Sequence, residues 1–132
     1  MSDYLNELRD SARQVVAGAS TPMLEDTTWP LIVELGWLLT LVPEELDGLG
    51  LGALEACALH SELGKGLNQA PFLPAMMAID ALCQSTLADK AEWIGRFTTG
   101  ELATASLCEP SIALQGGALS GVSGVVQSAD NA

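Results

Sequence analysis

Two neighbouring carboxylates, Glu44 and Glu45, are spaced as a general acid–base pair could be. They follow Pro43 and precede a glycine-rich stretch, which is typical of a solvated surface loop. Exposed carboxylates are the ordinary case in folded proteins, because water stabilises their charge. We therefore interpret the pair as surface residues and assign no catalytic residue in the chain.

Three glycines, Gly48, Gly50 and Gly52, follow at intervals of two residues and suggest a loop that could cradle a phosphate. A phosphate-binding loop requires a preceding β-strand and a GxGxxG or GxxxxGK pattern, and the sequence has neither feature here. Glycine also permits backbone conformations that other residues avoid, so tight turns use it often. Turn geometry is therefore the favoured role of these glycines.

The chain has one histidine, His60, and three cysteines, Cys57, Cys83 and Cys108. One histidine cannot build a metal site without further ligands, so we predict no metal and expect His60 on a helix surface or at the edge of the core. The cysteines form no CxxC pair and are odd in number, which favours reduced thiols in a cytoplasmic compartment. Cys57 and Cys83 are most simply small core residues.

The charge balance is strongly acidic, with 5 basic and 17 acidic residues and a formal net charge of −12. Such a surface repels nucleic acid and anionic membranes, so we predict neither as a partner. No run of 18 apolar residues is present, so we expect no membrane span. The polar N-terminus resembles neither a signal peptide nor a transit peptide. An anionic ligand would depend on backbone N–H groups or on the few cations, which are Arg9, Arg13, Lys65, Lys90 and Arg96.

Helical periodicity dominates the first hundred residues. Apolar side chains at helical spacing predict five helices, at residues 3–17, 27–36, 53–64, 74–84 and 87–98. The segment 74–84 is almost wholly apolar, which predicts a helix buried on all sides. Pro30 is expected in the first turn of the second helix, where its missing N–H costs nothing. The predicted fold class is therefore mainly α.

The sequence pattern changes after residue 100, where alternating apolar and polar residues and several glycines replace the helical periodicity. Residues 101–108 and 118–128 are predicted to form two strands with a turn between them. Two strands alone cannot form an independently stable sheet, so we expect an incomplete β segment. The predicted organisation is a helical domain at residues 1–100 and the start of a middle β domain at residues 101–132.

A series of short motifs runs through most of the chain in a fixed order. They are ELGWLL at 34–39, LVPEELDGLGLG at 41–52, SELGK at 61–65, TGE at 99–101, LCEP at 107–110 and ADNA at 129–132. None of these motifs is specific alone, but their order resembles the acyl-CoA dehydrogenase family. The resemblance implies a helical bundle like the N-terminal domain of that family, followed by the first strands of its β domain.

Members of that family combine a helical domain, a central β domain and a C-terminal four-helix bundle around FAD. They oxidise an acyl-CoA between its α and β carbons, and the flavin carries the redox chemistry. The resemblance therefore implies FAD as cofactor, an acyl-CoA as substrate, and a homo- or hetero-oligomer. The family's catalytic base lies in the C-terminal bundle, which has no counterpart in this sequence.

The resemblance also assigns candidate site residues. Its flavin-facing positions fall on Leu107, Cys108, Val125 and Gln127. The family has a hydroxyl donor where this chain has Cys108, and a thiol is a much weaker donor. The acyl chain would contact a helix that carries Met76, Met77 and Ile79, although a structural core explains these side chains equally well.

Two functions of different classes remain open at this point. The chain is either part of an acyl-CoA dehydrogenase-like flavoprotein, or a non-catalytic helical subunit or truncated scaffold that packs against a complete dehydrogenase subunit. The helical motifs favour the first. The weaker match of the flavin-facing strands favours the second.

Overall fold

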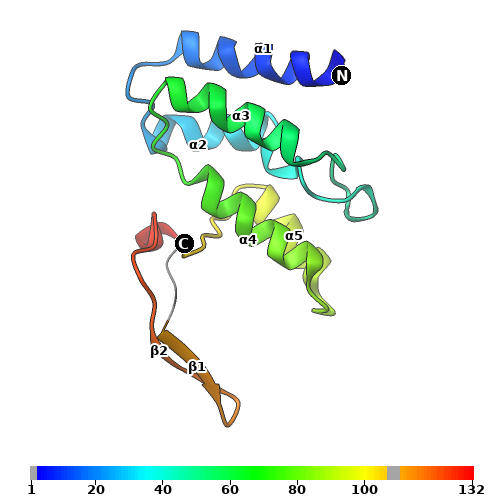
Figure 1. The fold of residues 1–132 in the computed structure, drawn as a ribbon, viewed down its shortest axis with the longest axis vertical. Coiled ribbons are helices and arrows are strands. Elements are labelled where there is room, and N and C mark those ends of the chain that lie inside the picture. The colour runs from blue at the N-terminus through cyan, green and yellow to red at the C-terminus, as the bar shows by residue number, and fades with distance from the viewer. Residues whose placement is uncertain (1–2, 107–110) are drawn as a thin grey trace.

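The computed structural model describes residues 3–106 and 111–132. Within them, five α-helices are followed by a two-stranded hairpin (Figure 1), so the mainly α prediction is confirmed. The helices are α1 (Asp3–Gly18), α2 (Glu25–Glu34), α3 (Ala53–Lys65), α4 (Phe72–Gln84) and α5 (Lys90–Thr98). Short 3-10 turns, η1 (Trp37–Leu39) and η2 (Glu44–Leu46), lie between α2 and α3, and a third, η3 (Ala129–Asn131), follows the hairpin. None of the described helices is long and apolar enough to cross a membrane.

Three helices begin at other residues than predicted, namely α2, α4 and α5, which begin at Glu25, Phe72 and Lys90. Helix α2 begins at Glu25, because Glu25 and Asp26 place negative charge in the first turn, where the helix dipole favours it. Pro30 therefore lies inside α2 and not in its first turn. Helix α5 begins at Lys90, later than predicted, because the Ser85 hydroxyl accepts a hydrogen bond from the Leu87 amide and holds the preceding residues in a turn.

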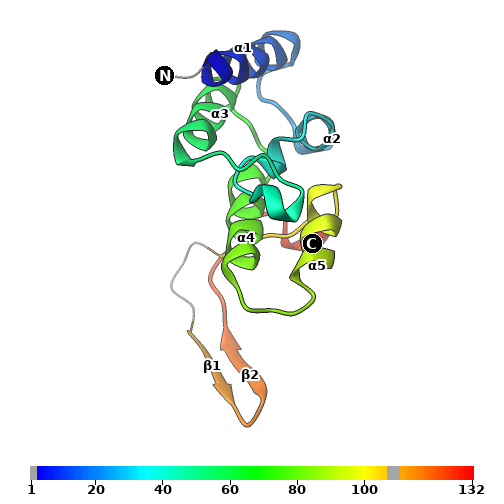
Figure 2. The ribbon, with the colours of Figure 1, turned by 90° about the vertical axis from the view of Figure 1, so that its right-hand side faces the viewer.

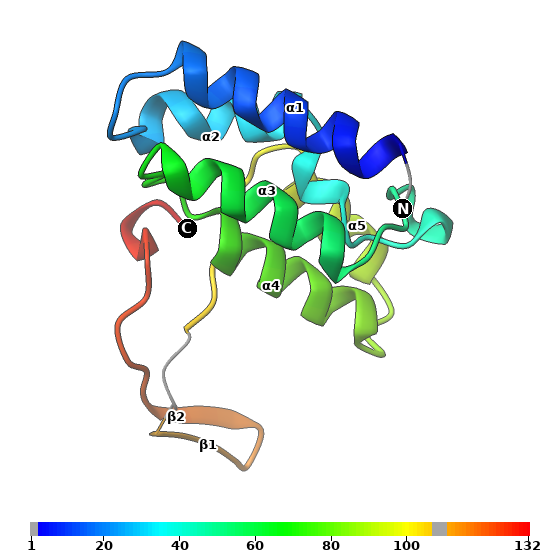
Figure 3. The same cartoon turned by 45° about the horizontal axis from the view of Figure 1, so that its top comes forward.

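The core lies where the helices meet. Helix α1 packs along α3, and α4 packs along α5, as Figures 1 and 3 show. Phe72 at the start of α4 is fully buried, and the centroid of its ring lies 6.4 Å from the ring centroid of Trp37 in η1. The core is built mainly of aliphatic side chains, among them Leu8, Ala12, Ile32, Leu59, Leu63, Met76, Ile79 and Ile94.

The stretch 41–52 folds back on the residues before it. The amides of Leu49, Gly50 and Leu51 donate to the carbonyls of Leu39, Val42 and Thr40, at 3.0, 2.8 and 2.9 Å. Gly50 has a φ of +61°, and a Cβ added to Gly48 would lie 2.0 Å from the Val42 carbonyl oxygen. These glycines therefore serve turn geometry, as predicted.

The first predicted strand, at residues 101–108, was wrong, whereas the second, at residues 118–128, contains the observed β2. Residues 101–106 form no strand, and the hairpin consists of β1 (Ser111–Gln115) and β2 (Ala118–Val122), paired antiparallel. Gly116 and Gly117 form the two-residue turn, with φ of +57° and +80°, and such a Gly-Gly pair is a strong hairpin signal. Residues 111–115 thus form a strand, whereas the sequence predicts a connection over residues 111–117.

The hairpin extends away from the helices in all three views (Figures 1, 2 and 3). Every strand residue is exposed. The chain then returns to the helices, where the Gln127 side-chain amide donates to the Gln69 carbonyl (3.2 Å) and the Ser128 hydroxyl donates to Glu25 (3.1 Å). The division at residue 100 stays a prediction, and these contacts run across it.

Candidate functional site

The three predicted acyl-pocket residues point to two different sides of α4. Met76 and Ile79 are 3% and 1% exposed and belong to the core, whereas Met77 is 43% exposed. Leu73, one turn before Met77, is 45% exposed. The prediction that α4 is buried on all sides was therefore wrong. The helix packs against α5 and η1 and leaves a stripe at i and i+4 open.

The predicted flavin-facing residues do not converge on one site within the described residues. Leu107 and Cys108 lie outside the described residues. Val125 is 87% exposed. Gln127 lines a pocket of about 190 Å³ beside His60 and Asn68.

That small pocket does not fit FAD. Small-molecule and cofactor sites usually enclose roughly 300–1,000 Å³. The Gln127 side-chain amide also donates already to the Gln69 carbonyl, and its backbone carbonyl accepts from the Thr104 hydroxyl at 2.9 Å. The described residues around Gln127 therefore do not form an FAD pocket, and we assign none of them a step in flavin chemistry.

His60 lies at the edge of the core, as predicted. Its ring packs against Phe72 with 4.5 Å between ring centroids. Its Nε2 atom is buried and has no hydrogen-bond partner among the described residues. Burial lowers the pKa of the imidazole, so the ring is neutral at pH 7. A proton shuttle needs a partner within hydrogen-bond reach, and the described structure supplies none.

Two basic residues meet at one buried carboxylate, Glu62 of α3. Lys65 lies 2.8 Å from one carboxylate oxygen, and Arg13 of α1 lies 3.2 Å from the other. The hydrogen bond from Lys65 lowers the pKa of Glu62, burial opposes this, and Arg13 lowers it further. The network therefore joins α1 to α3 and holds the charge of Glu62 in a largely buried position.

The remaining cations do not gather into an anion site. Arg96 lies over the Trp93 ring, 4.3 Å from its centroid, and forms a bidentate pair with Glu101. Lys90 donates to two backbone carbonyls, each at 3.0 Å. Over residues 3–106 and 111–132, Arg9 is the one Lys or Arg side chain that neither pairs with a carboxylate nor donates to a backbone carbonyl. The described cations therefore provide no cluster for the phosphates of a CoA.

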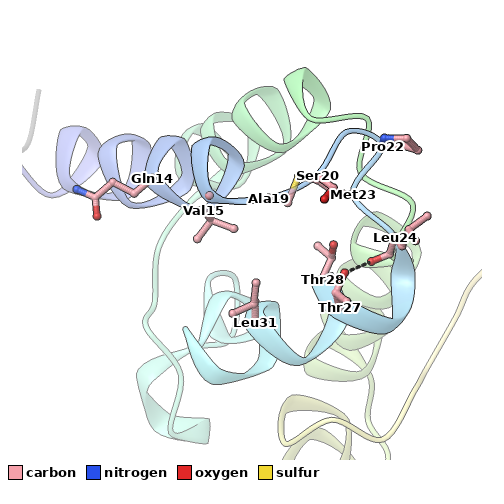
Figure 4. Close-up of a pocket in the computed structure, with 11 residues that line it drawn as sticks. Gln14, Val15, Ala19, Ser20, Pro22, Met23, Leu24, Thr27, Thr28 and Leu31 are labelled. Carbon is pink, nitrogen blue, oxygen red and sulfur yellow. Dashed lines mark hydrogen bonds between the residues drawn. The ribbon is translucent and has the colours of Figure 1, made fainter.

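No described group of three or more His, Cys, Asp and Glu side chains is placed to hold a metal ion. A cavity of about 500 Å³ lies between the C-terminal end of α1 and α2, and no sequence motif marks it (Figure 4). Val15 of α1 and Leu31 of α2 point toward one another across it. The local pattern gives no signal for this cavity, because it depends on how the two helices diverge.

Comparison with known proteins identifies the family. The family model for "Acyl-CoA dehydrogenase, N-terminal domain" matches residues 2–101. The chain is similar to an acyl-CoA dehydrogenase, FadE28, of Mycobacterium tuberculosis (strain ATCC 25618 / H37Rv), with 32% identity over 105 residues, 77% of this chain and 31% of the relative. The chain thus spans about a third of the length of this curated relative. No solved structure matches the chain significantly. The ordered motifs, the helical fold and these matches together show that the chain belongs to the acyl-CoA dehydrogenase family.

Proposed function

We propose that this chain is the helical part of an FAD-dependent oxidoreductase that dehydrogenates an acyl-CoA thioester between its α and β carbons. The match of residues 2–101 to the family's N-terminal domain is the observation that carries the proposal. The relative that resembles this chain is itself named an acyl-CoA dehydrogenase. On this proposal the described helices shape the active site from outside, and the flavin and the catalytic base are held by other parts of the enzyme.

The part we assign to this chain is one wall of the acyl-binding chamber. Leu73 and Met77 supply exposed apolar side chains on α4, and Met76 and Ile79 support them from the core. A methionine side chain is flexible and polarisable, so it adapts to an aliphatic chain. Because the described cations do not cluster, the CoA phosphates are expected to contact another part of the enzyme.

The direct test uses the protein purified from its source with any bound partner. The proposal predicts a flavin absorption band in the visible region and reduction of an artificial electron acceptor that depends on acyl-CoA. Met77→Asp should raise the KM for long acyl-CoAs more than for short ones, because a carboxylate opposes an apolar chain. Glu92→Gln, an exposed position on α5, is the matched surface control and should leave both KM values unchanged. A colourless, inactive preparation would contradict the proposal.

A second candidate is a non-catalytic helical subunit that packs against a complete dehydrogenase subunit. Its supporting observation is the exposed apolar face of the hairpin, where Ile112 pairs with Gly121 and Leu114 pairs with Leu119. Cross-strand partners share a face of the sheet, so these side chains form one exposed apolar surface among the described residues. Native mass spectrometry of the purified protein separates the two candidates. A hetero-oligomer in which this chain is dispensable for turnover favours the subunit, and a single polypeptide that carries this chain together with the flavin-binding part of the enzyme excludes it.

Location and assembly follow from the same reasoning. We infer a cytoplasmic protein, because the described cysteines Cys57 and Cys83 are free thiols. We also infer a homo- or hetero-oligomer, on the family resemblance and on the exposed hairpin face.

A further inference from the structure

The cavity between α1 and α2 lies apart from the α4 surface assigned to the acyl chain. It has a volume of about 500 Å³, within the range that small-molecule sites usually occupy, roughly 300–1,000 Å³. Its walls come from the last turns of α1, the connection at residues 19–24, and the first two turns of α2 (Figure 4).

The cavity follows from how the two helices are held. Helix α1 packs against α3, whereas α2 packs against η1, so the two helices diverge from the loop that joins them. Met23 in that loop is pinned on both sides, because its amide donates to the Gly66 carbonyl (3.0 Å) and its carbonyl accepts from the Gln69 amide (2.9 Å). The loop is therefore ordered before any ligand binds, and binding does not carry the entropic cost of ordering it.

The base of the cavity is closely packed. The Met23 side chain is 2% exposed. A Cβ added to Gly66 would lie 2.4 Å from the Met23 sulfur, so a larger residue at this position would displace the Met23 side chain. The two backbone hydrogen bonds of Met23 thus hold the loop before α2 against the loop after α3 at the base of the cavity.

The chemistry of the lining selects the class of ligand. Val15, Ala19, Met23, Leu24 and Leu31 provide an apolar surface. Ser20, Thr27 and Thr28 provide hydroxyls at the end nearer the connecting loop, and the Thr27 hydroxyl donates to the Leu24 carbonyl at 3.2 Å. None of the described lining residues is ionisable, and the chain carries a net charge of −12. An anion therefore finds no counter-charge here.

We propose that this cavity binds a small uncharged molecule, mostly aliphatic, with a single hydroxyl or carbonyl group that reaches the threonine end. A medium-chain alcohol represents the class. The apolar body is transferred from water to an apolar wall, and the polar group meets the hydroxyl-bearing wall. A protein partner is a poorer fit, because a stable protein interface buries about 1,200 Å² or more, and this recess is the size of one small molecule.

The test uses Nile red, an uncharged fluorescent dye, with the full chain. The dye should become fluorescent on binding, and 1-decanol should displace it. Decanoate has the same chain length but carries a charge, so it should displace the dye at least about tenfold less well.

Two variants of the same helix give a matched comparison. Leu31 lines the cavity and is 37% exposed, and Leu35, one turn further along α2, is 41% exposed and is not among the described lining residues. Leu31→Glu and Leu35→Glu add the same charge at positions of similar exposure. Leu31→Glu should weaken dye binding about tenfold or more, and Leu35→Glu should change it by about twofold or less.

The outcomes decide the proposal. Equal binding by both variants, or no displacement by 1-decanol, would show that the dye binds another apolar surface and would overturn the assignment. Absence of dye binding to the unmodified chain would also overturn it. A second measurement covers a variant that fails to fold. In the unmodified chain, 1-decanol should shift the methyl resonances of Val15, Ala19 and Leu31, and shifts confined to the hairpin would contradict the proposal.

Discussion

A buried carboxylate, Glu62, holds the first helix to the third. Its side chain is 6% exposed and bonds to Lys65 and to Arg13. Helical spacing with Leu59 and Leu63 places Glu62 on the inner side of α3, but its partner Arg13 lies far away in the sequence. Helical spacing can therefore indicate that a carboxylate faces the core, but it cannot identify the distant residue that pairs with it.

Replacing this carboxylate should destabilise the helical domain. Glu62→Gln leaves Arg13 and Lys65 without their shared anion, and the thermal midpoint of unfolding should fall clearly. Glu101→Gln removes the ion pair with Arg96, which is more exposed than the pairs of Glu62, and should lower the thermal midpoint less. Because the pKa of Glu62 is lowered, its contribution is present above its unfolded pKa of about 4.5 and is lost as pH falls through the native value. Equal midpoints for both variants would contradict this account.

The single histidine should make stability depend on pH below about 6.5. Burial lowers the pKa of His60 below its usual 6.5, so the unfolded chain binds a proton more readily than the native one. Stability is therefore full above about pH 6.5 and falls as pH decreases toward the native pKa. Urea unfolding at pH 7.0 and 5.5 measures this effect. Between these two pH values, the free energy of unfolding of His60→Phe should fall less than that of the unmodified chain. The same loss in both proteins would show that His60 is not responsible.

At the scale of elements, apolar periodicity predicted all five helices, because each has an inward face at helical spacing. It did not predict which side of α4 stays open, because an almost wholly apolar segment has no polar face to mark it. The pattern did not predict β1, because this strand is short and lies directly before the Gly116–Gly117 turn.

The turn at residues 41–52 should depend on one glycine. A Cβ at position 48 would lie 2.0 Å from the Val42 carbonyl oxygen, so Gly48→Ala must displace backbone and should cost about 2 kcal/mol or more. Gly95→Ala in α5 meets nothing within 4 Å and should stabilise by about 1 kcal/mol, through helix propensity. Denaturant unfolding measures both changes. A Gly48→Ala variant as stable as the unmodified chain would contradict the described turn.

For the whole molecule, the ordered motifs predicted the family, and the match over residues 2–101 confirms it. The motifs did so because they mark helix ends and turns, which the fold constrains strongly. The cavity between α1 and α2 could not be predicted, because its existence depends on the relative orientation of two helices that hardly touch. The flavin-facing positions also remain predictions, since Leu107 and Cys108 lie outside the described residues.

The most direct test of the central claim is one spectroscopic experiment on the protein purified from its source with its natural partners. Our account predicts a visible flavin band that is bleached when an acyl-CoA is added without an electron acceptor, and that returns when an acceptor follows. A preparation that contains this chain in stoichiometric amount but shows neither flavin absorption nor bleaching by any acyl-CoA would contradict it.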